Sequence, residues 1–303
     1  MEEKTKKVNL ISVFRDTYLK MGDTDTYAKI NAAFAYGGTE MALASLNQAM
    51  DMNINKYVLF NFKMVSDLVN AVDGIEVDVK EVEVDELNKY TKETAKHLGQ
   101  KKWKRVKKPG KQTLEGVQAV SYGRIRKGVG DDFRRTSRMR LVIKKVTKKL
   151  KKKNLFELKG IMEQCLDDCK TNLSESDMIG LAQRMSKYKF KKTVGFPYTV
   201  MTGMLDGQSF VFPGDLEAST EKLHRQMFKQ KKYEASERVV TISDYIKSRV
   251  GSGGVESKDL GKYEEEIRAE QEKKEREAKK KAEQKKKNKN KNKNKNKNKK
   301  DND

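Results

Sequence analysis

Apolar segments with the spacing of β-strands alternate with amphipathic helical segments over residues 8–79. The expected strands cover residues 8–16, 57–62 and 75–79, and the expected helices cover residues 39–50 and 63–72. A strand and an amphipathic helix can each bury an apolar face against the other, so this order is typical of α/β proteins. We therefore predict an α/β sandwich.

The chain from residue 81 to residue 250 adds one expected insertion, several helices and a hairpin. Residues 81–108 are Lys-rich and of weak periodicity, which predicts an insertion into the sandwich. Asp206-Gly207 is typical of a hairpin turn within 198–212, and Ser174 with Asp177 three residues later resembles a capping box. The other predictions are a short capped helix at 113–119, a strand at 120–126, and helices at 135–151, 155–170, 174–188, 215–230 and 241–249.

The C-terminal segment has a composition that separates it from the domain at 1–250. Glycine and serine at 251–257 predict a linker. Residues 258–284 have Glu and Lys neighbours that favour a single charged helix. Residues 285–303 are rich in alternating Lys and Asn, so we expect this tail to bury no core and to be disordered.

The net charge indicates an anionic partner. The formal charge is +23, and residues 258–303 hold 19 basic and 11 acidic residues, a net +8, which leaves +15 for residues 1–257. The domain is therefore itself basic, as expected for a protein that meets phosphate, nucleic acid, anionic polymer or a membrane surface. No stretch is apolar enough to span a bilayer, and the N-terminus does not resemble a signal peptide.

Residues 124–140, RIRKGVGDDFRRTSRMR, concentrate six arginines. On the expected strand 120–126, Arg124 and Arg126 project to the same face because side chains alternate. Two neighbouring guanidinium groups repel each other unless an anion lies between them. Either they bind an anion, or both point into water at a sheet edge.

The helix expected at 135–151 divides the remaining arginines. At about 100° per residue, Arg135 and Arg138 fall on or beside its apolar stripe, whereas Arg134 and Arg140 fall on the side that faces water. An inward arginine needs a partner, and a helix start suits an anion. Four converging guanidinium groups would match a diphosphate. The inward pair argues against a duplex-binding surface, and the few aromatics argue against a single-strand platform.

Arg15 and Asp16 end the expected strand 8–16, at the kind of position where α/β folds place ligands. A structural salt bridge explains the pair equally well. Cys165 and Cys169 lie four residues apart on one face of the expected helix 155–170. With no other ligand nearby, they are better interpreted as small half-buried residues than as a zinc site or a strained disulfide.

Four blocks, taken in series, resemble the LytR-CpsA-Psr (LCP) family: ISVFRDTYL, YAKINAAFAYGG, TLEGVQAVSYGRIRK and DDFRRTSR. The segment FPYTVMTGMLDGQSFVFPGDLEAS resembles the family's C-terminal region, and the resemblance covers residues 4–250. It implies an α/β/α fold with a mixed central sheet, outside the cytoplasmic membrane. It also implies a phosphotransferase that attaches an anionic glycopolymer, of the teichoic acid or capsule type, from an undecaprenyl pyrophosphate carrier to peptidoglycan. Magnesium would assist, and arginines would hold the pyrophosphate.

The resemblance assigns roles by position. Arg15 matches the catalytic arginine, with Asp16 beside it, although Phe14 stands where the family usually has proline. The pyrophosphate ligands would be Lys29, Arg124, Arg126, Arg135 and Arg138, and Asn31 and Asp132 are candidate supporting residues. Met139 replaces a frequent glutamine, which places any amide contact there in doubt.

The resemblance also indicates what this chain does not contain. Family members begin with a membrane helix and a strand, and an Asp that helps to hold magnesium follows; here these parts are expected upstream of Met1. The C-terminal tail is expected to attract anionic wall polymer by charge. The alternative is a non-catalytic protein that binds anionic polymer or nucleic acid, in keeping with the family's older description as transcriptional attenuators.

Overall fold

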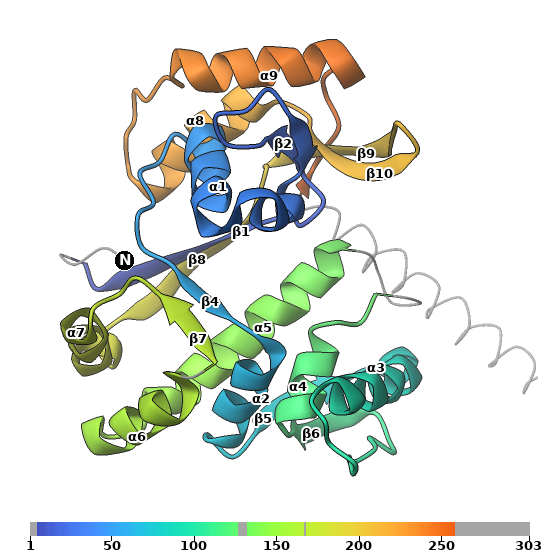
Figure 1. Cartoon of the computed structure of the whole chain (residues 1–303), viewed down its shortest axis with the longest axis vertical. Coiled ribbons are helices and arrows are strands. Elements are labelled where there is room, and N and C mark those ends of the chain that lie inside the picture. The colour runs from blue at the N-terminus through green and yellow to red at the C-terminus, as the bar shows by residue number, and fades with distance from the viewer. Residues whose placement is uncertain (1–4, 127–131, 167, 258–303) are drawn as a thin grey trace, which may run out of the picture. The chain divides into compact units, whose positions relative to one another are not determined.

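The computed structural model describes residues 5–126, 132–166 and 168–257, in which helices and strands alternate as predicted (Figure 1). Within these residues the strands pair in five small sheets. The central pair is parallel and joins β1 (Lys7–Val13) to β8 (Lys189–Phe196). The antiparallel pairs are β2 (Tyr18–Lys20) with β3 (Tyr27–Lys29), β4 (Val58–Phe60) with β7 (Cys169–Thr171), β5 (Ile75–Val79) with β6 (Gly110–Leu114), and β9 (Thr199–Leu205) with both β10 (Gln208–Pro213) and β11 (Val255–Glu256).

Helices cover both faces of the β1–β8 pair (Figure 1). One face carries α1 (Ala33–Met50), α8 (Leu216–Met227) and α9 (Glu237–Val250). The other carries α5 (Asp132–Leu150), α6 (Leu155–Leu166) and α7 (Glu175–Met185). The prediction of an α/β protein is therefore confirmed, and β1 and β8 lie between two helical layers.

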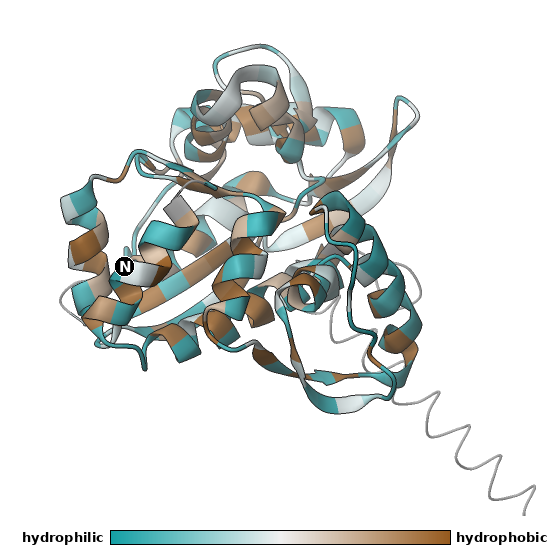
Figure 2. Ribbon diagram, turned by 60° about the horizontal axis from the view of Figure 1, so that its bottom comes forward, coloured by the Kyte–Doolittle hydropathy of each residue, from teal (hydrophilic) through white to brown (hydrophobic). Residues whose placement is uncertain are grey.

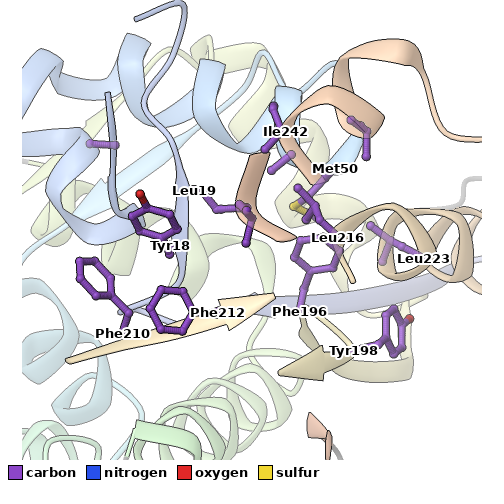
Figure 3. Packing of buried hydrophobic residues seen from close by; sticks show 14 of the residues in the cluster. Tyr18, Leu19, Met50, Phe196, Tyr198, Phe210, Phe212, Leu216, Leu223 and Ile242 are labelled. Atoms are coloured by element: carbon purple, nitrogen blue, oxygen red, sulfur yellow. The ribbon is translucent and has the colours of Figure 1, made fainter. Parts of the chain in front are cut away.

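The core on the α1 side is filled by large apolar side chains. Phe196, at the end of β8, is fully buried and lies beside Leu216 and Met50 in Figure 3. Tyr18 forms a second group with Phe210 and Phe212 (Figure 3), and their rings make edge contacts. The expected helix 39–50 is therefore ordinary core. The helical geometry of α1 breaks just before this segment, at Gly37 and Gly38.

A second core surrounds the β5–β6 hairpin. Ile75, Val77 and Val79 are buried on β5, whereas the two residues between them are exposed, which confirms the predicted alternation. Around them lie α2 (Phe62–Asn70), η2 (Glu81–Glu83), α3 (Val84–His97) and α4 (Gly116–Tyr122), together with α5.

The interpretation of residues 81–108 as an insertion without clear periodicity is wrong over α3. This helix buries Leu87, Thr91, Thr94 and Ala95, which recur at helical spacing. Three of its five buried residues are polar, so the stripe has only a weak apolar signature in the sequence. Asn88, also buried, exchanges two 2.8 Å hydrogen bonds with the backbone of Val106 and fixes the loop that follows.

The predicted strand at 120–126 is also wrong. Residues 120–122 belong to α4, whose start is fixed by a capping box between Glu115 and Gln118, and Gly123 and Arg124 lie in the turn that follows. Gly116 lies so close to α2 that an added Cβ would stand 2.1 Å from the carbonyl oxygen of Ser66. Burial of all seven residues of α4 outweighs the strand preference of Val120 and Tyr122.

Helix ends and turns follow the local signals. The Ser174–Asp177 capping box begins α7, and Asp206 and Gly207 form the turn between β9 and β10, as predicted. α6 ends at Leu166, earlier than expected, and residues 251–257 contain β11, which pairs with β9. In Figure 2 most helices carry both brown and teal residues, as expected of helices with one buried face. Residues 258–303, and with them the predicted charged helix and tail, lie outside the described residues.

Candidate functional site

The C-terminal end of β1 lies against the start of α5. Phe14 is buried, and its ring contacts that of Phe133 edge to face, with 4.5 Å between the ring centroids. Phe14 also packs so closely on β8 that an added Cβ on Gly195 would stand 2.4 Å from its ring. The aromatic pair therefore places Arg15 beside the helix that carries Arg134 and Arg135.

Arg15 and Asp16 are partly open to solvent at this end of the sheet. The Arg15 guanidinium lies 3.9 Å from the Asp16 carboxylate, and 42% of the Arg15 side chain is exposed. The backbone N–H of Asn31 donates to the Arg15 carbonyl at 3.2 Å. Lys29 pairs with Tyr18 across β2 and β3, and its ammonium group lies 5.2 Å from the centre of the Phe210 ring. The first two family blocks therefore meet at one place.

Arg124 follows α4 and is held by α3. Its Nη1 donates to Thr94 Oγ1 at 2.7 Å, and its guanidinium lies 5.0 Å from the centre of the Phe62 ring and 5.3 Å from that of Tyr90. Two aromatic faces and one hydroxyl fix the plane of the guanidinium. This arrangement restricts the side chain before any ligand binds.

Arg138 turns inward, as predicted, but its partner is a carboxylate of the protein. Its Nε and Nη2 each lie 3.0 Å from Glu83 Oε1, and both side chains are almost fully buried. Its Nη1 donates to the backbone carbonyl of Ile125 at 3.1 Å. Ile125 lies between Arg124 and Arg126, so Arg138 fixes the backbone that carries this pair.

The end of α4 approaches α5 closely where Gly123 faces Met139. An added Cβ on Gly123 would stand 2.4 Å from Met139 Sδ, so only a glycine allows this packing without movement of the methionine. Met139, which stands where the family often has glutamine, therefore has a packing role here.

The other arginines of α5 are less sharply divided than the helical wheel predicted. Arg134 and Arg135 are both half-buried. The prediction that Arg140 faces water is wrong: its Nη1 is inaccessible and has no hydrogen-bond partner among the described residues, and burial lowers its pKa. Ile143 of the same helix is exposed, although Val142 and Val146 are buried. Asp132 begins α5, but its side chain lies outside the described part of the structure.

An apolar cavity of about 430 Å³ lies at the other end of α5. Its walls are α5, α6 and α7, with Val8 of β1 and Phe190 of β8. Lys151 is among the few polar lining residues, and its ammonium group donates to the Tyr188 carbonyl. The sequence does not indicate this cavity, because the apolar stripes at 158–165 and 178–185 have the same spacing whether a core is filled or hollow.

Both cysteines line this cavity as free thiols. Cys165 belongs to α6 and Cys169 to β7, so the prediction that they share one helix face is wrong. Cys165 is buried and Cys169 is partly buried, which agrees with the prediction of small packed residues. Burial raises the pKa of both thiols.

The described residues contain no cluster of three or more His, Cys, Asp and Glu side chains that could hold a metal ion by themselves. Magnesium is commonly held by one or two carboxylates together with the phosphates of a substrate. The partly exposed carboxylate of Asp16 fits the first requirement. Among the described helices, none has the length and hydropathy needed to cross a bilayer.

Comparison with known proteins gives consistent matches. The chain is 31% identical over 179 residues to the polyisoprenyl-teichoic acid–peptidoglycan teichoic acid transferase TagU of Enterococcus faecalis, which covers 58% of this chain and 54% of that protein. The chain thus spans about half the length of the curated relatives it matches.

Solved structures share the fold. A protein of Enterococcus faecalis described as a transcriptional regulator matches with a TM-score of 0.64 and 24% identity, over 82% of this chain and 87% of its own. TagT of Bacillus subtilis, solved with bound octaprenyl pyrophosphate lipid, matches with a TM-score of 0.51 and 21% identity, over 82% of this chain and 80% of its own. The model of the LytR_cpsA_psr family matches residues 1–228. This chain therefore belongs to the LytR_cpsA_psr family.

Proposed function

We propose that this protein transfers an anionic glycopolymer, of the teichoic acid or capsule type, from an undecaprenyl pyrophosphate carrier to peptidoglycan. The observation that carries the proposal is that α5 bears arginines at its start and lines an apolar cavity at its end. Arg135 and Thr147 are 12 residues apart in the sequence, about 18 Å at 1.5 Å per residue. A polyprenyl pyrophosphate has the same division into an anionic head and a long apolar chain.

The basic residues would neutralise the pyrophosphate. Arg124 and Arg126 would bind its oxygens through bidentate hydrogen bonds, together with Arg135, Arg15 and Lys29. Arg138 would act through the backbone of Ile125 rather than by direct contact, because Glu83 occupies two of its nitrogens. Asn31 would hold the Arg15 backbone through its N–H.

The transfer breaks one phosphorus–oxygen bond and forms another. A hydroxyl oxygen of the acceptor sugar would attack the phosphorus that bears the glycopolymer, and the bond from that phosphorus to the bridging oxygen would break. Undecaprenyl phosphate would leave with the electron pair, and the hydroxyl proton would pass to solvent. Arg15, oriented by Asp16, would stabilise the charge that develops on the phosphoryl oxygens.

Magnesium would fit this site when the pyrophosphate is bound. Asp16 would supply one carboxylate ligand, and the pyrophosphate oxygens would supply others. When bound, the ion would offset negative charge on the pyrophosphate. The Lys- and Asn-rich tail at 285–303 would attract anionic wall polymer by charge.

Binding of undecaprenyl pyrophosphate to single variants tests this proposal. Arg124→Ala should lower the affinity at least tenfold, whereas Arg249→Ala, an exposed arginine of α9, should leave it unchanged. Equal effects would overturn the assignment.

The dependence of affinity on salt separates this proposal from nucleic-acid binding. Neutralisation of many phosphates along a nucleic acid makes its affinity fall steeply with salt. A lipid pyrophosphate held in a cavity should remain bound at salt that abolishes DNA binding. Loss of all anion binding on deletion of residues 258–303 would contradict the pocket assignment.

A further inference from the structure

The first turn of α6 presents an aromatic side chain to solvent. Asn154 and Glu157 cap the helix reciprocally: each backbone N–H donates to the other's side chain at 2.9 Å. With the helix beginning at this position, Leu158 points into the protein and is buried. Phe156, two residues earlier, lies on the opposite side of the helix and is 86% exposed. Leu155 beside it is also exposed.

The exposed pair borders an apolar groove between α6 and α7. The groove has a volume of about 540 Å³, and Ile179 of α7 lies on its other side. Three of its lining residues, Met162, Met178 and Ala182, also line the apolar cavity. These three side chains therefore border both the groove and the cavity, and two of them are flexible methionines.

The sequence around the exposed pair is strongly basic. Residues 144–159 hold eight lysines and one acidic residue. Lys148 and Lys152 are exposed and lie in the last turn of α5 and the loop before α6. Lysines beside an exposed aromatic side chain favour an anionic lipid surface, since the charges attract the headgroups and the ring enters the interface.

We propose that the start of α6 and the α6–α7 groove form the surface that meets an anionic lipid bilayer. Phe156 and Leu155 enter the headgroup region while Lys148 and Lys152 contact the lipid phosphates. Resting on the proposed function, we further infer that the polyprenyl chain passes from the bilayer through this groove into the cavity. Movement of the Met162 and Met178 side chains opens a passage from the groove to the cavity.

Quenching of tryptophan fluorescence by brominated lipid tests the membrane contact in the full chain. Trp103, the single tryptophan of the sequence, is first replaced by Phe. Phe156→Trp in this background should be quenched several-fold by phosphatidylglycerol vesicles with brominated acyl chains. The matched control is Met204→Trp on the β9–β10 hairpin, which is also exposed but lies in a different part of the fold. Both variants carry the same basic tail, so only the position of the tryptophan differs.

Absence of quenching at residue 156, or equal quenching at residues 156 and 204, would overturn the membrane surface. The double substitution Lys148→Glu and Lys152→Glu should weaken the quenching at residue 156, and vesicles of phosphatidylcholine should give little. Undecaprenyl pyrophosphate binding in detergent separates the two proposals. Binding without quenching would contradict only the membrane surface, whereas quenching without binding would contradict the proposed function and the lipid path.

Discussion

Arg138 and Glu83 form a buried ion pair, with 3.0 Å between Nη2 and Oε1 and only 6% and 5% of the side chains exposed. The pair joins α5 to η2 and holds the carbonyl of Ile125. The buried pair also lies beside Tyr122, because the centre of the Tyr122 ring is 5.8 Å from the Arg138 guanidinium. Desolvation, and then the Glu83 charge, raise the pKa of this phenol to about 12.

Removal of one partner should be more damaging than removal of both. Glu83→Ala removes the carboxylate that neutralises the buried Arg138 guanidinium, so we expect the free energy of unfolding to fall by about 3–5 kcal/mol. Glu83→Leu with Arg138→Met should recover most of that loss, because neither charge then remains buried. Denaturant titration measures both changes, and Glu81→Ala, an exposed neighbour, is the control. A loss of equal size in Glu81→Ala would contradict the assignment of the pair as the cause.

Filling the apolar cavity should block the lipid chain without harming the fold. Ala182→Phe places a ring in a cavity of about 430 Å³, so we expect the affinity for undecaprenyl pyrophosphate to fall at least tenfold. Binding of inorganic pyrophosphate, which has no chain, should be unchanged. Ala218→Phe on the exposed side of α8 serves as the matched control, and calorimetry measures the affinities. An unchanged lipid affinity in Ala182→Phe would show that the chain binds elsewhere.

The two cavity cysteines report on the same cavity. Because burial raises the pKa of Cys165 and Cys169, less thiolate is present at pH 8 than for a free cysteine. We expect slow alkylation by N-ethylmaleimide that accelerates as the pH rises, and further protection when undecaprenyl pyrophosphate is bound. Mass spectrometry follows the modification of each thiol. An equal rate of alkylation with and without the lipid would argue against a lipid chain beside these residues.

Asp51 should make part of the stability dependent on pH. It ends α1 with φ of 50° and accepts hydrogen bonds from Tyr233 and from the backbone and side chain of Ser236. Burial alone would raise its pKa, but these hydrogen bonds outweigh burial and lower the pKa below 3.8. A depressed folded pKa contributes stability that is present above the ordinary value and is lost as the pH falls through the folded value.

Asp51→Asn should therefore lower the free energy of unfolding at pH 7 by about 1 kcal/mol. It should also reduce the loss of stability below about pH 4. Asparagine tolerates the left-handed conformation, so the backbone is retained. Denaturant titration from pH 7 to pH 2 measures the effect, with Asp244→Asn, an exposed carboxylate of α9, as the control. Parallel pH curves for Asp51→Asn and the unmodified protein would contradict this account.

The family blocks placed the candidate arginines within two segments of the chain, but several of their contacts depend on residues distant in the sequence. Arg138 was predicted to turn inward because of its position on the helix, and it does. Its partner, Glu83, lies 55 residues away on η2, within a segment that the sequence did not identify as structured. Arg140 lies on the same helix, and only the tertiary packing shows that it is half-buried with its Nη1 inaccessible to solvent.

The sequence by itself determined the elements whose signals are local. The alternation in β5, the capping box of α7 and the Asp206-Gly207 turn each depend on residues a few positions apart. Tertiary structure decided α4, where burial against α2 and α3 outweighs strand preference, and α3, whose buried stripe is largely polar. It also decided the cavity, because an apolar stripe shows that a helix face is buried but not whether the space it faces is filled.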